Sequence, residues 1–103
     1  MDTKKNKFEI DAIARHFMIQ KRIVKEYDLG VSFRTKEQLD YAKRLMKKVS
    51  LIMNDLDEAS KFIIKNEVVL GKKGTWYYGY LSVPTYYRHR NKAYKDFLEY
   101  MEQ

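Results

Sequence analysis

The sequence predicts an all-α fold in which an N-terminal helical hairpin packs on a C-terminal helix-turn-helix unit, with four to five helices in total. Glycine and proline are scarce: the chain has four glycines and one proline in 103 residues, whereas an all-β chain of this length needs many turns. Apolar residues recur at helical spacing, and residues with capping chemistry precede the apolar stretches. The length and a hydrophobic content of 45% indicate a single domain, residues 1–103, with the hairpin over residues 1–55 and the second unit over residues 56–103.

The first predicted helix covers residues 8–29 and follows a polar start, residues 1–7, that we expect to be frayed. Gly30 comes directly after it, where a helix C-cap residue is expected. Gln20 is the one polar member of the predicted inner face. The apolar members, spaced three, four or seven apart, are Ile10, Ile13, Phe17, Val24 and Tyr27.

The second predicted helix begins after Thr35 and ends near Asn54. Thr35 is a good N-cap residue, and Gln38 three residues later completes a capping box. The opposite, basic face also carries acids, and we interpret it as solvated surface. We expect the apolar stripes of both helices to form the core; the alternative is that part of them forms a homodimer, as in DNA readers that bind two half-sites. The apolar residues of the second helix are Leu39, Ala42, Leu45, Met46, Val49, Ile52 and Met53, with Leu56 just beyond.

The C-terminal unit is predicted to open with a third helix whose N-cap is Asp57. Glu58 lies in its first turn, where the helix dipole favours an anion. Phe62 and Ile63 belong to its inner face. Two glycines that bracket two lysines, residues 71–74, then predict a break in helical structure.

The last part of the chain is predicted to contain two helices joined by a turn. Residues 74–80 are rich in aromatic side chains and predict a short helix. The final helix is expected over residues 83–101, with Ser82 as its N-cap. Pro84 then falls in the first turn, where its missing N–H costs little.

The positive charge of the chain is concentrated in this region. The formal net charge is +7, and the segment from residue 68 to residue 95 contains Lys72, Lys73, Arg88, Arg90, Lys92 and Lys95 but no acidic residue. Such a segment attracts phosphate groups, and it would attract any other polyanion in the same way. The alternative is an ordinary solvated surface on a lysine-rich chain.

Two helices joined by a tight turn, the second of them basic, are typical of a DNA reader whose second helix enters the major groove. In this interpretation Leu81, Tyr86, Ala93, Phe97 and Met101 face inward. Arg88 and Asn91 on the outer face would contact bases, with Thr85 and Tyr87 beside them. Cations on the flanks of the helix and on the preceding loop would contact phosphates, namely Lys72, Lys73, Arg90, Lys92 and Lys95. The predicted DNA-binding residues are Lys72, Lys73, Ser82, Val83, Thr85, Tyr87, Arg88, Arg90, Asn91, Lys92 and Lys95.

The string Leu-Ser-x-x-Thr-Tyr-Tyr-Arg-x-Arg-x-Lys-Ala, residues 81–93, resembles the recognition helix of the sigma-factor region-four-like helix-turn-helix superfamily. It is closest to small phage-type transcription regulators of the ArpU and RinA kind. The segment that starts Leu-Asp-Glu-Ala at residue 56 is similar to the opening of that domain, so the resemblance covers about residues 56–101. It implies binding to double-stranded DNA in transcription control, sometimes with contact to RNA polymerase.

Two further interpretations share the same signals. The protein could be a helical interaction module that docks on RNA polymerase or another partner without reading DNA. RNA binding fits the charge equally well. The aromatic residues between Trp76 and Tyr87 could stack on single-stranded nucleic acid, but we expect most of them to form the core, with Tyr87 outside.

Several classes of function are disfavoured by what the sequence lacks. The chain has no cysteine and two histidines, so we expect no metal site and no cofactor. No catalytic arrangement or phosphate-binding loop can be recognised, and we predict that the protein is not an enzyme. We see no signal peptide, and the longest uncharged run, residues 74–87, is too short and polar to cross a bilayer. The sequence therefore predicts a cytoplasmic protein that does not contact membranes.

Overall fold

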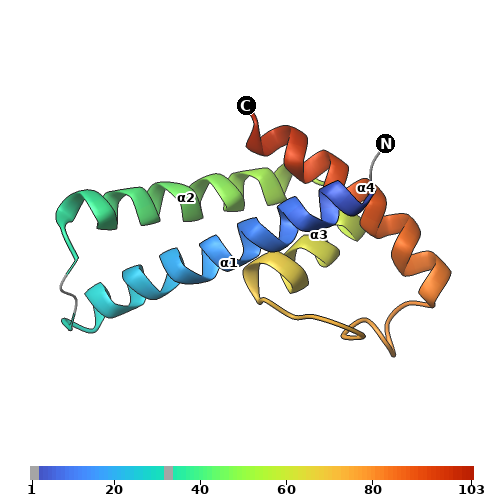
Figure 1. Ribbon diagram of the computed structural model, residues 1–103, viewed down its shortest axis with the longest axis horizontal. Coiled ribbons are helices and arrows are strands. Elements are labelled where there is room, and N and C mark those ends of the chain that lie inside the picture. The colour runs from blue at the N-terminus through green and yellow to red at the C-terminus, as the bar shows by residue number, and fades with distance from the viewer. Residues whose placement is uncertain (1–2, 32–33) are drawn as a thin grey trace.

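The computed structural model describes residues 3–31 and 34–103, and within them the chain forms four α-helices and one π-helical segment, with no strand (Figure 1). The elements are α1 (Thr3–Asp28), α2 (Lys36–Asp55), α3 (Glu58–Ile64), η1 (Lys65–Val69) and α4 (Val83–Met101). The prediction of an all-α fold with a hairpin packed on C-terminal helices is confirmed. None of the helices in the described part of the chain is both long and apolar enough to cross a membrane.

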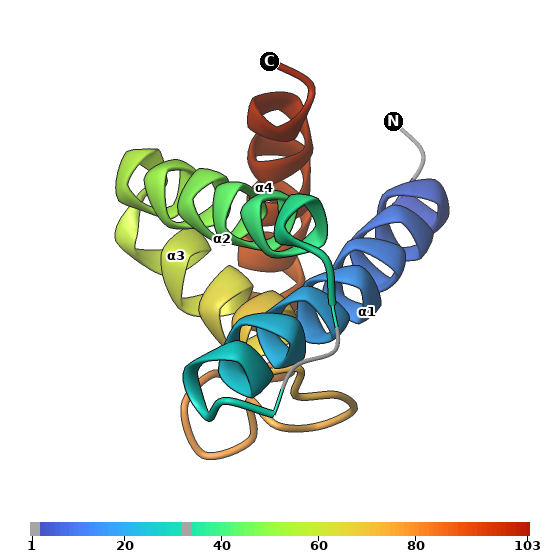
Figure 2. The same cartoon turned by 90° about the vertical axis from the view of Figure 1, so that its left-hand side faces the viewer.

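Helices α1 and α2 lie side by side as the predicted hairpin, while α3, η1 and α4 gather at one end of it (Figures 1 and 2). The inner residues of α2 are buried or packed against the core as predicted. One core cluster joins α1 through Ile10 and Phe17, α2 through Val49 and Ile52, and the later elements. The opposite end of the hairpin extends beyond the C-terminal helices.

Two expectations for α1 are wrong. The helix begins at Thr3, so the start predicted to be frayed is helical; Lys7 and Asp11 form an ion pair of 3.0 Å one turn apart there. Tyr27, predicted to face inward, is 54% exposed, and Ile23 is buried instead. The physical reason is that Tyr27 lies at the end of the hairpin that no later helix covers, where its ring contacts the Lys43 ammonium at 5.4 Å.

The predicted helix caps are present. Gly30 has a φ of 73° and donates its N–H to the Tyr27 carbonyl, while the Val31 N–H reaches the Glu26 carbonyl, which together make a Schellman motif. Thr35 and Gln38 form the complete capping box of α2.

Asp57 begins the third helix as predicted, since its carboxylate accepts a hydrogen bond of 2.7 Å from the Ser60 N–H. Helix α3 then widens into the π-helical turn η1, which ends with the Leu70 N–H bonded to the Lys65 carbonyl at 2.9 Å. A π turn inserts an extra residue and rotates the side chains that follow it. In η1 this places Asn66, Glu67 and Val68 in the interior.

The short aromatic helix predicted at residues 74–80 is absent; this segment is a series of turns. Gly74 and Gly79 have φ values of 67° and 91°, which are incompatible with a right-handed helix. The aromatic residues are held by ring packing instead. Tyr77 stacks on Tyr86 of α4 at a centroid distance of 3.6 Å, and Trp76 packs against the ring of Phe62 in α3 at 5.5 Å.

Helix α4 begins as predicted, with Ser82 as N-cap and Pro84 in the first turn. Its inner face contains the expected Tyr86, Ala93 and Phe97. Tyr94 and Leu98 are buried as well, which the sequence analysis did not predict. Because α4 contacts α1, α2 and α3, its orientation is fixed from several sides.

Candidate nucleic-acid interface

The exposed face of α4 carries one row of polar residues. Arg88, Asn91 and Lys95 are all exposed and follow one another at i, i+3 and i+7, which places them on the same side of the helix. Among the described residues they have no hydrogen-bond or ion-pair partner. We call these three residues the α4 row. Tyr87 and Val83 lie beside it, 43% and 45% exposed.

Two predicted contact residues at the start of α4 serve the helix cap. Ser82 accepts a hydrogen bond from the Thr85 N–H at 3.4 Å, and the two hydroxyl groups are 2.8 Å apart. Thr85 is only partly exposed. These groups fix where α4 begins, and thereby the position of the α4 row relative to the preceding turns.

Arg90 does not extend to the flank of α4 as expected, but lies among aromatic rings. Its guanidinium carbon is 4.6 Å from the ring centroid of Tyr87 and 5.2 Å from that of Tyr94. The Nε atom is buried and has no hydrogen-bond partner within the described structure. Contacts of this kind between a cation and ring faces hold the side chain in place. Arg90 therefore packs within the protein.

Lys92 is also engaged within the protein. Its ammonium group lies 2.5 Å from the Asp57 carboxylate at the start of α3 and 2.9 Å from that of Asp96, one turn further along α4. The hydrogen bond to Lys92 is the main cause that lowers the pKa of Asp57 from 3.8 to about 2, and the same bond raises the pKa of Lys92. Lys92 thus ties α4 to the cap of α3.

Lys72 and Lys73 lie beside α1. Both line a groove whose other wall includes Arg15 and Met18 of α1. The predicted DNA-binding set therefore divides into the α4 row with its neighbours, two helix-capping residues, two cations engaged internally, and two lysines beside α1.

The sequence analysis missed Glu67, which organises this end of the molecule. This carboxylate in η1 is 8% exposed and accepts a hydrogen bond of 2.9 Å from the Trp76 indole. The hydroxyl groups of Tyr86 and Tyr94 donate to it as well. We call Glu67 with these three donors the Glu67 cluster. A signal was available in the sequence, since Glu67 is an acid next to two valines, shortly before a run of aromatic residues with polar tips.

Burial and the neighbouring carboxylate raise the pKa of both tyrosines of the cluster. For Tyr86 the causes are burial first and then the hydrogen bond to Glu67; for Tyr94 they are burial and then the negative charge of Glu67. Both hydroxyl groups thus keep their protons and remain donors to the carboxylate at physiological pH. The cluster joins η1, the turns at residues 74–80 and α4.

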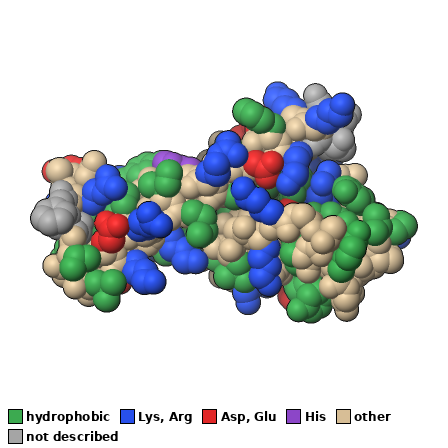
Figure 3. Space-filling model, turned by 60° about the horizontal axis from the view of Figure 1, so that its bottom comes forward, with side chains coloured by type: hydrophobic (Ala, Val, Ile, Leu, Met, Phe, Trp, Pro, Cys, Tyr) green, Lys and Arg blue, Asp and Glu red, His purple; other side chains and the backbone are tan. Residues whose placement is uncertain are grey.

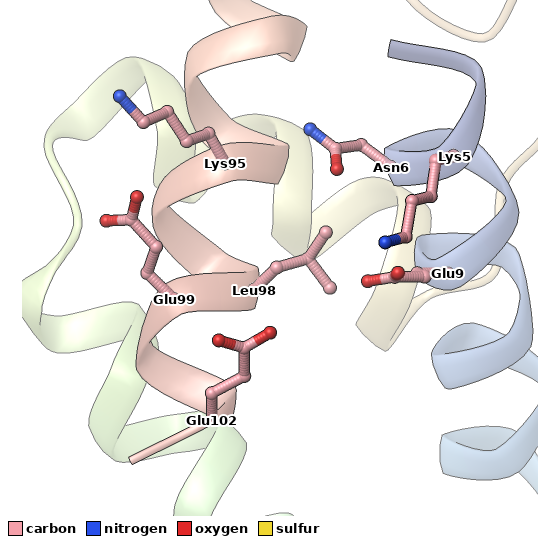
Figure 4. A pocket seen from close by; sticks show the side chains of 7 residues that line it. All are labelled: Lys5, Asn6, Glu9, Lys95, Leu98, Glu99 and Glu102. Atoms are coloured by element: carbon pink, nitrogen blue, oxygen red, sulfur yellow. The ribbon is translucent and has the colours of Figure 1, made fainter. Parts of the chain in front are cut away.

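A shallow pocket separates the end of α4 from the start of α1 (Figure 4). Leu98 points from α4 toward α1 between two glutamates, Glu9 and Glu102, with Lys5 beside Glu9. Lys95 and Glu99 lie on the other side of α4 in this view. No group of three histidine or carboxylate side chains in the described residues is placed to hold a metal ion.

Comparison with known proteins gives no match: no protein-family model fits the chain, and no curated protein or solved structure is detectably similar to it.

Proposed function

We propose that the protein is a DNA-binding transcription regulator that inserts the N-terminal half of α4 into the major groove. The observation that carries the proposal is the α4 row, three polar residues without partners in the described structure on one face of a well-capped helix. Arg88 would pair with guanine and Asn91 with adenine, since each has two hydrogen-bonding groups that match those bases. Lys95, further along, would contact the phosphate backbone.

The distribution of charge supports contact by α4 only as far as Lys95. No acidic residue occurs between residues 68 and 95, whereas Asp96, Glu99 and Glu102 follow. Phosphates would be repelled from the part of the helix that follows Lys95. The expected short helix is absent, so the bracing role of the first helix in a helix-turn-helix unit would fall to α3, which packs against α4. Helix α4 would then correspond to the recognition helix of the region-four-like superfamily that residues 81–93 resemble. Helix α3 would replace residues 74–80 as the bracing helix.

The test is fluorescence anisotropy with labelled duplexes enriched by the protein from a random library. We expect Arg88→Ala to weaken binding to the enriched duplex by about 5- to 150-fold, the range of one bidentate base contact of 1–3 kcal/mol, and to relax the preference at one base pair. Arg44→Ala, which removes an exposed cation from α2, is the matched control and should change affinity little. Equal losses for both variants, or no enrichment of any sequence, would overturn the proposal.

A second candidate function, docking on RNA polymerase without DNA reading, is favoured by exposed aromatic residues next to the α4 row. Tyr78 and Tyr80 are 59% and 68% exposed. Tyr78 and Tyr87 each pack against one ring of the stacked pair Tyr77 and Tyr86. Exposed aromatic side chains are enriched at protein interfaces. Capture of purified RNA polymerase after nuclease treatment, lost in a Tyr78→Ser, Tyr80→Ser double variant and kept in Arg88→Ala, would favour this candidate over DNA reading.

A further inference from the structure

The outer face of α1 carries a second candidate site, separate from the α4 row. Two grooves adjoin along this helix and share Met18 and Ile19 as lining residues. The first groove runs between α1 and the segment at Gly71, and the second continues toward the far end of the hairpin. We call the two together the α1 groove.

The centre of the α1 groove is apolar and open. Met18 is 42% exposed and Ile19 is 55% exposed, although both lie in the middle of a long helix. Met18 also lies over Gly71, since a Cβ atom there would be only 3.5 Å from the Met18 sulfur. Methionine adapts its shape to different neighbours, which suits a surface that receives apolar side chains from a partner.

The rims of the α1 groove are strongly basic. The acidic lining residues are Asp11, paired with Lys7 at 3.0 Å, and Glu67, which is held by the aromatic donors of its cluster. The space-filling view shows Lys and Arg side chains spread along the molecule, with few acidic ones among them (Figure 3). The basic lining residues are Lys7, Arg15, Lys21, Arg22, Lys25, Arg34, Lys72 and Lys73.

We propose that the α1 groove binds an acidic, amphipathic helical segment of a partner protein. An apolar centre between basic rims complements a helix with apolar residues at i, i+3, i+4 and i+7 and carboxylates on either side. From Lys7 to Lys25 the groove follows α1 for about 27 Å at 1.5 Å per residue, which matches about five turns of a partner helix. A nucleic-acid backbone has the charge for the rims but no apolar groups for the centre.

The probe is a fluorescein-labelled designed peptide of about 18 residues, the length that 27 Å accommodates, with leucines on one helical face and glutamates on the other. A scrambled peptide of the same composition is the control for charge. We expect the full chain to bind the amphipathic peptide at least about 10-fold more tightly than the scrambled one, a difference of about 1.4 kcal/mol. Equal binding of both peptides would overturn the proposal, because charge alone would then explain the affinity.

Substitutions inside and outside the α1 groove test whether the peptide binds there. Ile19→Glu should weaken binding of the amphipathic peptide by at least about 10-fold. Leu51→Glu, at a 56% exposed position of α2, should leave the affinity for the peptide unchanged. Both positions are exposed, and circular dichroism should show wild-type helix content for both variants.

Equal effects of Ile19→Glu and Leu51→Glu would overturn the proposal. The proposal would also be overturned if an Arg15→Glu, Arg22→Glu double variant no longer bound duplex DNA but still bound the peptide. The groove would then be a binding site for phosphate groups. The α4 row is unchanged in all of these variants, so failure here is distinguishable from failure of DNA reading by α4.

Discussion

Two parts of the core are held together by different chemistry. Helices α1 and α2 contribute aliphatic residues such as Ile10, Val49 and Ile52, which pack in one cluster with the later elements. The end formed by η1, the turns at residues 74–80 and α4 is organised by the Glu67 cluster. Apolar contacts have no direction, whereas hydrogen bonds do. The cluster therefore fixes how α4 is rotated about its axis, and with it which basic residues face outward.

Removal of the Glu67 carboxylate is the most direct test of what the Glu67 cluster contributes. Glu67→Ala leaves two buried tyrosine hydroxyl groups and the part-buried Trp76 indole N–H without their acceptor. Each buried donor left unpaired costs about 1–3 kcal/mol. We expect a loss of about 3–5 kcal/mol in the free energy of unfolding, measured by urea denaturation. Glu99→Ala, which removes an exposed carboxylate from α4, is the control and should change stability by less than about 0.5 kcal/mol. Similar losses in both variants would mean that the cluster contributes little.

Loss of side-chain volume in the hairpin should lower the free energy of unfolding strongly, whereas a small change of side-chain shape should lower it little. Ile52 is 5% exposed, and Ile52→Ala should cost about 3 kcal/mol through lost burial and the cavity left behind. Ile52→Val should cost only about 1 kcal/mol. The same denaturation measurement checks both values. A valine variant as unstable as the alanine variant would show that the hairpin core also depends on close fit.

Removing one donor tests whether the cluster acts through direction. Tyr94→Phe keeps the buried ring but removes one hydrogen bond to the carboxylate, and we expect a loss of about 1.5–3 kcal/mol. Tyr100→Phe is the matched control, because this part-buried tyrosine also packs against the core and has no hydrogen bond from its hydroxyl in the described structure. If Tyr94→Phe is as stable as Tyr100→Phe, ring packing alone holds α4.

The turn after α1 provides a smaller and purely local effect. Gly30 has a φ of 73° with open space around its Cα, so an added methyl group meets only backbone strain. Gly30→Ala should lower the free energy of unfolding by about 1 kcal/mol. Gly30→Asn, which tolerates this conformation better, should lose less. A neutral alanine variant would mean that the Schellman motif does not determine the stability of this end.

The ion pair between Asp57 and Lys92 should have the smallest effect, since both side chains are largely exposed. The pKa of Asp57 is lowered in the folded protein from 3.8 to about 2, so its contribution is present above about pH 4 and is lost as the pH falls toward 2. Asp57→Asn retains a capping oxygen but removes this charge. The stability difference between wild type and Asp57→Asn, from urea midpoints, should shrink between pH 4 and pH 2. A constant difference over this range would exclude the carboxylate charge as its source.

The elements that could be predicted are those with local causes. Thr35 with Gln38, Asp57 and Ser82 each cap a helix by reaching a backbone group within three residues, so the chemistry is visible in a short window of sequence. The inner face of α4 followed from helical spacing around Tyr86 and Phe97. The short helix at residues 74–80 could not be excluded this way, because its aromatic residues suit a helix equally well until they find partners in α3 and α4.

The sequence by itself determined where α2, α3 and α4 begin, many of the residues that the helices bury, and that the positive charge is concentrated before residue 96. Only the tertiary structure decided which of those charges remain available. Lys92 meets Asp57 from 35 residues away, and Arg90 lies against rings that the Glu67 cluster holds in place. The α4 row has no such partner in the described residues. A formal charge is a property of one residue, but its availability depends on the groups that folding places beside it, and those come from distant parts of the chain.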